Sequence, residues 1–330
     1  MRTCAMVMAI VAITSAAMAQ VQGAPGYRAS LYFGNAHANQ AMMSFDWTSG
    51  GTLYYSTART NWVPGMSVWR VESGAGQGVY NDANVYAGSW VAAAGERVYF
   101  NEDSNFRVYV AGVAQPVLQQ DNLWGLFPRG SQMFISGADA NWAGELFVSQ
   151  IGDAGALASP VSVGKVGASS GPMAWDAAGN LYVAEGYNPA AEPGIYRFSA
   201  AELAAAMADP IGAPLSGTGH LWTTLADYTG GGATGLAVSD AGGLLVTATV
   251  FGGASQLREY AVGEDGTAGA FALLATSSAR LSTVRVADGL AYVASPAGIY
   301  TVSVPEPASL ALVGVGLAWL MGRRTRRTRS

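Results

Sequence analysis

Short apolar segments separated by turn residues recur along the middle of the chain. The clearest copy covers residues 173–198. Residues 173–175 and 181–184 are apolar, and the sequence Asp-Ala-Ala-Gly-Asn between them has the residues that favour a tight turn. A third segment, 195–198, alternates apolar and polar positions. This pattern predicts a β-hairpin followed by a third strand.

Five further segments fit the same template. The residues at the equivalent point of the second strand are Tyr54, Tyr99, Phe134, Tyr182, Leu245 and Tyr292, and the steps between them average about 48 residues. Four-stranded propeller blades repeat at about 40–50 residues. We therefore predict an all-β chain folded as a six-bladed β-propeller. A β-sandwich or a β-helix with coincidental hairpins is the alternative.

Two segments depart from the repeat. The longest step, 63 residues, contains Ser-Ala-Ala-Glu at 199–202, an alanine-rich run to 208 and Pro210. That order predicts a capped helix on the outside or on one rim of a blade. Residues 27–33 read as a strand that closes the ring against the last blade, which would remove an exposed sheet edge.

The first nineteen residues have the organisation of a signal peptide. Arg2 precedes an apolar stretch at 4–17, and Ala-Met-Ala at 17–19 is a small-x-small cleavage site. Cys4 is the only cysteine, so the body of the chain, residues 20–303, has no disulfide or thiolate chemistry.

Charge separates the body from the ends of the chain. Of 17 Lys and Arg, Arg2 and five arginines near the C-terminus lie outside the body, which leaves 11 basic against 21 acidic residues and a net charge of about −10. The body has a single lysine and no basic stripe. Nucleic acid is therefore an unlikely partner.

The C-terminal tail, residues 304–330, has three parts. Val304, Pro305, Glu306 and Pro307 form an extended segment, 308–322 is an uncharged apolar run, and 323–330 holds five arginines. The run is shorter than the ~20 residues of a usual membrane span. It has no polar face, however, and arginines that follow an apolar run hold that end in the cytoplasm and can snorkel. We predict a single transmembrane helix.

This order of motif, apolar helix and basic end resembles the PEP-CTERM sorting signal of Gram-negative bacteria. The resemblance implies recognition at residues 304–307 by an exosortase-type enzyme, with a precursor anchored in the inner membrane. It also implies a mature protein at the cell surface or outside the cell, often with exopolysaccharide as a partner. The alternative is a C-terminal anchor that is never processed.

The copy at 173–198 resembles the blades of NHL-type and gluconolactonase-like propellers. That resemblance implies acidic and Asn side chains holding a divalent cation, Ca²⁺ or Mg²⁺, in the funnel. Glu185 is the candidate funnel ligand, because it directly follows the buried strand 181–184. The common hydrolase and metalloprotease motifs are absent from the sequence, and His37 and His220 have no metal-ligand spacing.

Four tryptophans lie in segments predicted to be loops, beside Gly, Asn or His: Trp62, Trp124, Trp142 and Trp222. Such aromatics either stack on sugar rings or fix loops by packing. Three functions follow as alternatives. The first is an exported surface or matrix protein with a non-enzymatic binding or scaffolding propeller, the second a metal-dependent lactonase or hydrolase, and the third a carbohydrate-binding surface module.

Overall fold

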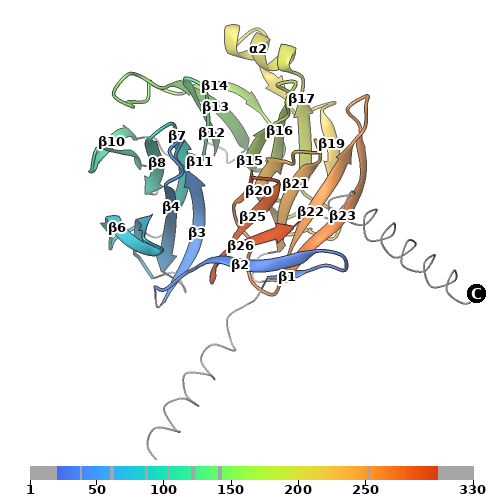
Figure 1. The fold of residues 1–330 in the computed structure, drawn as a ribbon. Coiled ribbons are helices and arrows are strands. Elements are labelled where there is room, and N and C mark those ends of the chain that lie inside the picture. Colours follow the sequence, from blue (N-terminus) through green and yellow to red (C-terminus); the bar gives the residue numbers. More distant parts are fainter. Residues whose placement is uncertain are drawn as a thin grey trace, which may run out of the picture.

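A computed structural model describes residues 21–37, 39–59, 63–85, 88–102, 105–119, 123–139, 143–250 and 253–303, without the side chains of 88, 89 and 124. The strands form six sheets, in which every pair except β14–β18 is antiparallel. The sheets are arranged around a common axis (Figure 1). The predicted six-bladed propeller is confirmed. Most strands of a sheet follow one another in the sequence and are ordered from the axis to the rim; β1, β2 and β18 are added from elsewhere in the chain.

The first three blades each contain a four-stranded meander, and the third has a short additional strand. The first contains β3 (Gln40–Trp47), β4 (Leu53–Arg59), β5 (Met66–Glu72) and β6 (Ala75–Asp82). The second contains β7 (Gly88–Ala94), β8 (Arg97–Glu102), β9 (Asn105–Val110) and β10 (Val113–Gln119). The third contains β11 (Leu123–Arg129), β12 (Gln132–Ala138), β13 (Gly144–Gln150) and β14 (Val161–Lys165), with β18 (Leu215–Ser216) parallel to its outer edge.

The other three blades vary this arrangement: the fourth has an insertion before its last strand, and the fifth and sixth each include a strand from the N-terminal segment. The fourth has β15 (Ser170–Trp175), β16 (Leu181–Glu185), β17 (Gly194–Phe198) and β19 (Leu221–Thr224). The fifth has β20 (Gly231–Val238), β21 (Leu244–Val250), β22 (Ser255–Val262) and β23 (Ala268–Ser277), and β1 (Gln22–Gly23) pairs with β23. The sixth has β24 (Val284–Ala287), β25 (Leu290–Ser295), β26 (Gly298–Ser303) and β2 (Arg28–Gly34).

The two ends of the body meet in the sixth blade. Strand β2 pairs antiparallel with β26, with Arg28 opposite Ser303 and Gly34 opposite Gly298. The strand predicted at 27–33 therefore closes the ring, as expected. The segment before it also contacts the fifth blade, where Val21 is buried in the core between the fifth and sixth blades. The N-terminal segment thus joins two neighbouring blades.

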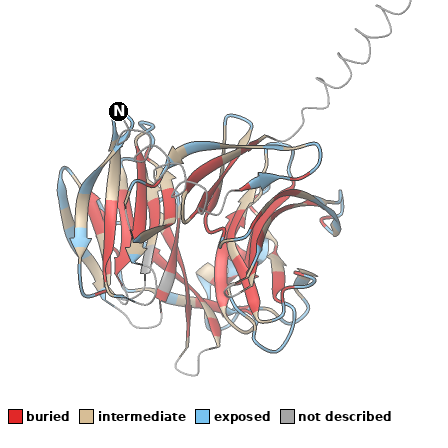
Figure 2. Ribbon diagram, turned by 90° about the horizontal axis from the view of Figure 1, so that it is seen from below, coloured by how far each residue is buried: buried red, intermediate tan, exposed pale blue. Residues whose placement is uncertain are grey.

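The core lies between blades. All six residues identified as equivalent in the sequence fall in the second strand of their blade, and all are less than 9% exposed. Trp47 and Trp175, each the last residue of a first strand, pack edge-on or tilted against the aromatic ring of a neighbouring blade, Tyr292 and Phe134 respectively. Figure 2 shows the buried positions concentrated within the sheets and the exposed ones on the loops and outer strands. Stacking of the blades therefore provides the apolar burial that no single blade could achieve.

Hydroxyl side chains connect adjacent blades near the axis. Ser44 of β3 accepts a hydrogen bond from the Val91 amide at 3.2 Å and another from the Thr283 hydroxyl at 2.9 Å, so one serine joins three blades. Ser170 of β15 accepts from the Gly137 amide at 2.8 Å and donates to the Gly137 carbonyl. These short polar groups satisfy backbone atoms that are buried where the blades converge.

The predicted helix is present as α2 (Ala200–Ala208). Ser199 and Glu202 form the reciprocal capping box, and Leu203 and Ala206 are buried against the core between the third and fourth blades. In Figure 1 the helix stands on the outside of the ring, above β14 and β17. Within the described residues, no helix is long and apolar enough to cross a membrane. The predicted signal peptide and the tail helix at 308–322 lie outside the described residues.

Candidate binding site at the mouth of the propeller

Glu185 ends β16 and is buried, with 2% of its surface exposed. Its Oε1 accepts hydrogen bonds from the Ala168 amide at 2.8 Å and the Tyr196 hydroxyl at 2.9 Å. Its Oε2 accepts from the Asn188 side chain and the Gly194 amide, both at 2.9 Å. Burial, and the charge of Glu185, raise the pKa of Tyr196, so its hydroxyl stays protonated and donates.

These contacts make Glu185 an anchor for the β14–β15 connection, the β16–β17 connection and β17. A side chain at Gly167 would overlap Glu185 Oε1, and Gly167 has a φ of +42°, so only glycine fits there without strain. Both carboxylate oxygens already accept two hydrogen bonds from the protein. Among the described residues, no group of three or more His, Cys, Asp or Glu side chains could hold a metal ion. The role of Glu185 as a ligand for Ca²⁺ or Mg²⁺ stays a prediction.

Glu102 occupies the equivalent position in the second blade. Glu102 and Glu185 lie three residues after Tyr99 and Tyr182, and both end their strand. Glu102 is 3% exposed; it accepts a hydrogen bond from Arg107 Nε at 2.6 Å and another from the Tyr80 hydroxyl. Two blades therefore use a buried carboxylate to fix the chain where the second strand ends.

The tryptophans do not all lie in loops. Trp62 and Trp142 lie outside the described residues, and Trp124 belongs to β11 although its side chain is not described. Trp222 lies in β19; its indole N–H donates to the Gly266 carbonyl at 2.8 Å, and its ring meets Tyr182 and Tyr260 edge-on. The loop prediction was thus wrong for Trp124 and Trp222. Trp222 lies in an outer strand, which is half polar, so its sequence resembles a loop; Trp124 lies in the first strand of its blade.

A cavity of about 270 Å³ opens beside the ring axis, where β20 begins. Its walls come from the β16–β17 connection, both ends of the β20–β21 hairpin and the link between the fifth and sixth blades. Gly186 and Tyr187 contribute to it, whereas Glu185 points away towards Gly167. A cavity at the mouth of a ring, assembled from several blades, is a favourable place for a small ligand.

Of the described residues that line this cavity, Arg280 is the only charged one. It is exposed to solvent, yet desolvation by the surrounding protein lowers its pKa. Both observations hold for a side chain that projects into a recess rather than from a convex surface. Arg280 could not be found from the sequence, because its neighbours are Ala, Ser and Leu and form no motif. The residues opposite it, from Gly253 back to Gly186, are 27 to 94 positions earlier in the chain.

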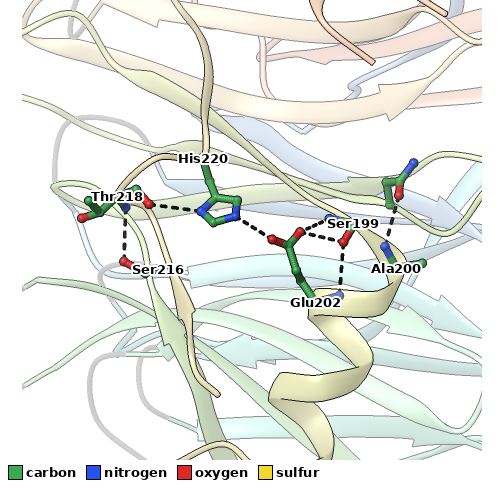
Figure 3. Close-up of polar contacts among 7 residues, drawn as sticks. Ser199, Ala200, Glu202, Ser216, Thr218 and His220 are labelled. Atoms are coloured by element: carbon green, nitrogen blue, oxygen red, sulfur yellow. Dashed lines mark hydrogen bonds and ion pairs between the residues drawn. The ribbon is translucent and has the colours of Figure 1, made fainter. Parts of the chain in front are cut away.

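A second polar cluster lies at the rim, at the N-terminus of α2 (Figure 3). His220 Nε2 is 2.8 Å from Glu202 Oε1, and the imidazole stacks on Phe198 at a centroid distance of 4.9 Å. Hydrogen bonds from Ser199 and His220 lower the pKa of Glu202 to about 2. The hydrogen bond with Glu202 raises the pKa of His220. The pair therefore fixes the segment before β19 to the helix.

This pair predicts a pH-dependent contribution to stability. The His220 contribution is complete below its unfolded pKa of about 6.5 and is lost as the pH rises through the raised folded value. The Glu202 contribution is complete above about 4.3 and is lost as the pH falls towards about 2. We expect His220→Gln to lower the free energy of unfolding by about 0.2–1 kcal/mol more at pH 5.5 than at pH 8.5, since the pair is partly exposed.

Thermal or urea denaturation at the two pH values measures this difference. In the His220→Gln background, Glu202→Gln should cost the same at pH 5.5 as at pH 8.5, because the partner charge is gone and only the capping-box contribution of Glu202 remains. An equal cost of His220→Gln at both pH values would show that stacking on Phe198, and not the ion pair, explains the contribution of His220.

Solved structures with the same fold cover a range of activities. The PQQ domain of a pyranose dehydrogenase from Coprinopsis cinerea aligns with 87% of this chain and 98% of its own, at 11% identity and a TM-score of 0.60. A gluconolactonase from Xanthomonas campestris aligns over 86% and 92% at 13% identity and a TM-score of 0.54. A virginiamycin B lyase from Staphylococcus aureus aligns over 84% and 100% at 8% identity and a TM-score of 0.51. At these identities the likeness shows the fold alone.

No protein of curated function matches this sequence significantly. Residues 303–327 match the PEP-CTERM protein-sorting motif. The match begins at Ser303, the last residue of β26, so the motif starts where the propeller ends. The motif implies an exported protein with a membrane-anchored precursor that an exosortase processes. The chain is thus a six-bladed propeller that carries a PEP-CTERM sorting motif at its C-terminal end.

Proposed function

We propose that this protein is exported, cut from its tail by an exosortase-type enzyme, and displayed at the cell surface or in the extracellular matrix as a binding module. The observation that carries this proposal is the junction at Ser303. The ring is already closed by β2 and β26 at the residue where the sorting motif begins. Cleavage after Ser303 would therefore leave all the described strands of the body in place.

The cavity at the mouth of the ring supports a binding role for the body. It is open, lies beside the axis and is lined by residues from separate blades. At about 270 Å³ it suits a ligand of roughly one sugar ring, since pockets for drug-sized ligands have about 300–1,000 Å³. Exopolysaccharide is the matrix partner that we propose, because many such polymers expose single sugar residues at chain ends or branches.

Substitution within the motif tests the sorting step. We expect Pro305→Ala combined with Glu306→Ala to move most of the protein from the surface or medium to the inner membrane, because the enzyme would no longer recognise the tail. Fractionation of a host that contains an exosortase, followed by immunoblotting, measures the distribution. Glu264→Ala, an exposed change on the body, is the matched control. An unchanged distribution of the motif variant would refute the proposed sorting.

A further inference from the structure

Arg280 has no hydrogen-bond acceptor or carboxylate partner among the described residues. Two other arginines of the fifth and sixth blades differ in this respect: Arg258 bonds to Gln256 at 2.8 Å, and Arg285 pairs with Asp46 at 3.3 Å. The guanidinium of Arg280 lines the cavity, so its N–H donors can reach a ligand that enters. An anion that entered the cavity would supply the missing partner.

The walls of the cavity limit what that anion can be. Gly186 and Gly232 contact each other so closely that a side chain at Gly232 would overlap the Gly186 carbonyl. This leaves a flat, open wall of backbone beside Tyr187, which is 42% exposed. An exposed tyrosine ring next to backbone amides and carbonyls suits a ligand with both an apolar face and hydroxyl groups, as a sugar ring has.

The charge of the site favours a single negative charge. Arg280 is the only cationic residue in the described part of the lining, and the body carries a net charge of about −10. A doubly charged phosphate would meet one cation in an otherwise negative field. A carboxylate carries one charge and fits the planar fork of an arginine with two parallel hydrogen bonds.

We propose that the cavity binds a sugar acid, with Arg280 forming a bidentate pair with the ligand carboxylate and Tyr187 lying beside the sugar ring. This inference rests on the proposed binding role of the propeller and names its ligand class. The carboxylate belongs either to a free sugar acid or to a uronic acid residue of a polysaccharide. The two sources share the same chemistry and differ in whether the cavity must admit a polymer.

Isothermal titration calorimetry on the full chain in nonionic detergent tests the proposal. The probes are D-glucuronate, an oligogalacturonide, D-glucose and inorganic phosphate. We expect saturable binding of glucuronate and none of glucose. Arg280→Gln should weaken the binding of glucuronate by about tenfold or more, as expected for loss of a charged hydrogen-bonded pair. Arg280→Lys should recover part of the affinity, because it restores the charge without the fork.

Arg28→Gln is the matched control, since it removes the same charge from the exposed outer strand β2. It should leave the binding of glucuronate unchanged. Binding of the oligogalacturonide that depends on Arg280 would identify a polysaccharide as the source, and binding of glucuronate alone would identify a free acid.

Three results would overturn the inference. They are no saturable binding of either acid, equal binding by Arg280→Gln, and binding of phosphate as tight as that of glucuronate. If D-glucose binds and Arg280→Gln does not weaken that binding, the propeller is still a binding module, but its ligand is not a sugar acid. No binding of any probe would count against both, while the sorting test with Pro305 and Glu306 would still stand on its own.

Discussion

Deletion of residues 21–34 is expected to abolish the stable fold of the body. The deletion removes β2, which forms the outer strand of the sixth blade, together with Val21, which is buried between the fifth and sixth blades. The whole length of β26 would then become an unpaired edge next to the core. The loss should exceed about 5 kcal/mol, which is comparable to the entire stability of many domains.

A circular permutant provides the matched control for this deletion. Arg28 lies opposite Ser303 in an antiparallel pair, so a short turn can join Ser303 directly to a copy of residues 28–34. This chain lacks the N-terminal strand but regains it at the other end. We expect the permutant to unfold cooperatively and the deletion variant to show no cooperative transition by circular dichroism and calorimetry. A deletion variant as stable as the intact body would contradict the role of β2 in closing the ring.

Glu185→Ala is expected to have the second largest effect on the body, a loss of roughly 3–5 kcal/mol. The substitution leaves the amides of Ala168 and Gly194 and the side chains of Asn188 and Tyr196 without their acceptor. Each buried donor that loses its partner costs about 1–3 kcal/mol, and part of this cost is recovered where water enters. The stability of Glu185→Gln should lie between those of the wild type and Glu185→Ala, because one side-chain oxygen remains as an acceptor.

Urea denaturation measures these losses, with Glu192→Gln as the control. Glu192 is exposed and lies in the same connection, so its substitution should change stability by less than about 0.5 kcal/mol. Addition of Ca²⁺ distinguishes an anchor from a metal ligand. If Ca²⁺ raises the Tm of the wild type and not of Glu185→Gln, Glu185 binds the metal, and the anchoring interpretation is insufficient.

Much of the fold could be predicted because its signals are local. A hairpin needs an apolar pair of strands and a turn, and each of the six copies contains these within about 12 residues of Tyr54 or its equivalents. The capping box of α2 is likewise a four-residue pattern. The outer strands were harder to predict, as Trp222 shows, because one face of such a strand meets water and its alternation is weak.

The site could not be predicted, because it depends on which loops meet. Glu185 was selected for its position after a buried strand, but its four partners come from two connecting segments and from β17, and the sequence does not show that these meet. Arg280 had no distinguishing neighbours, and its importance comes from Gly186, Tyr187 and Gly232 in two other blades. Such convergence follows from the closed ring and not from any local pattern.

The central claim is that the tail sorts the protein and is then cleaved from a complete propeller. The most direct test is to measure the intact mass of the protein recovered from the cell surface or the medium. We expect a single species that begins at Gln20, after the signal peptide, and ends close to residues 304–307. It should unfold cooperatively, since the ring is closed without the tail. A surface protein whose mass still includes residues 308–330 would contradict the account, because the tail would then be a permanent anchor.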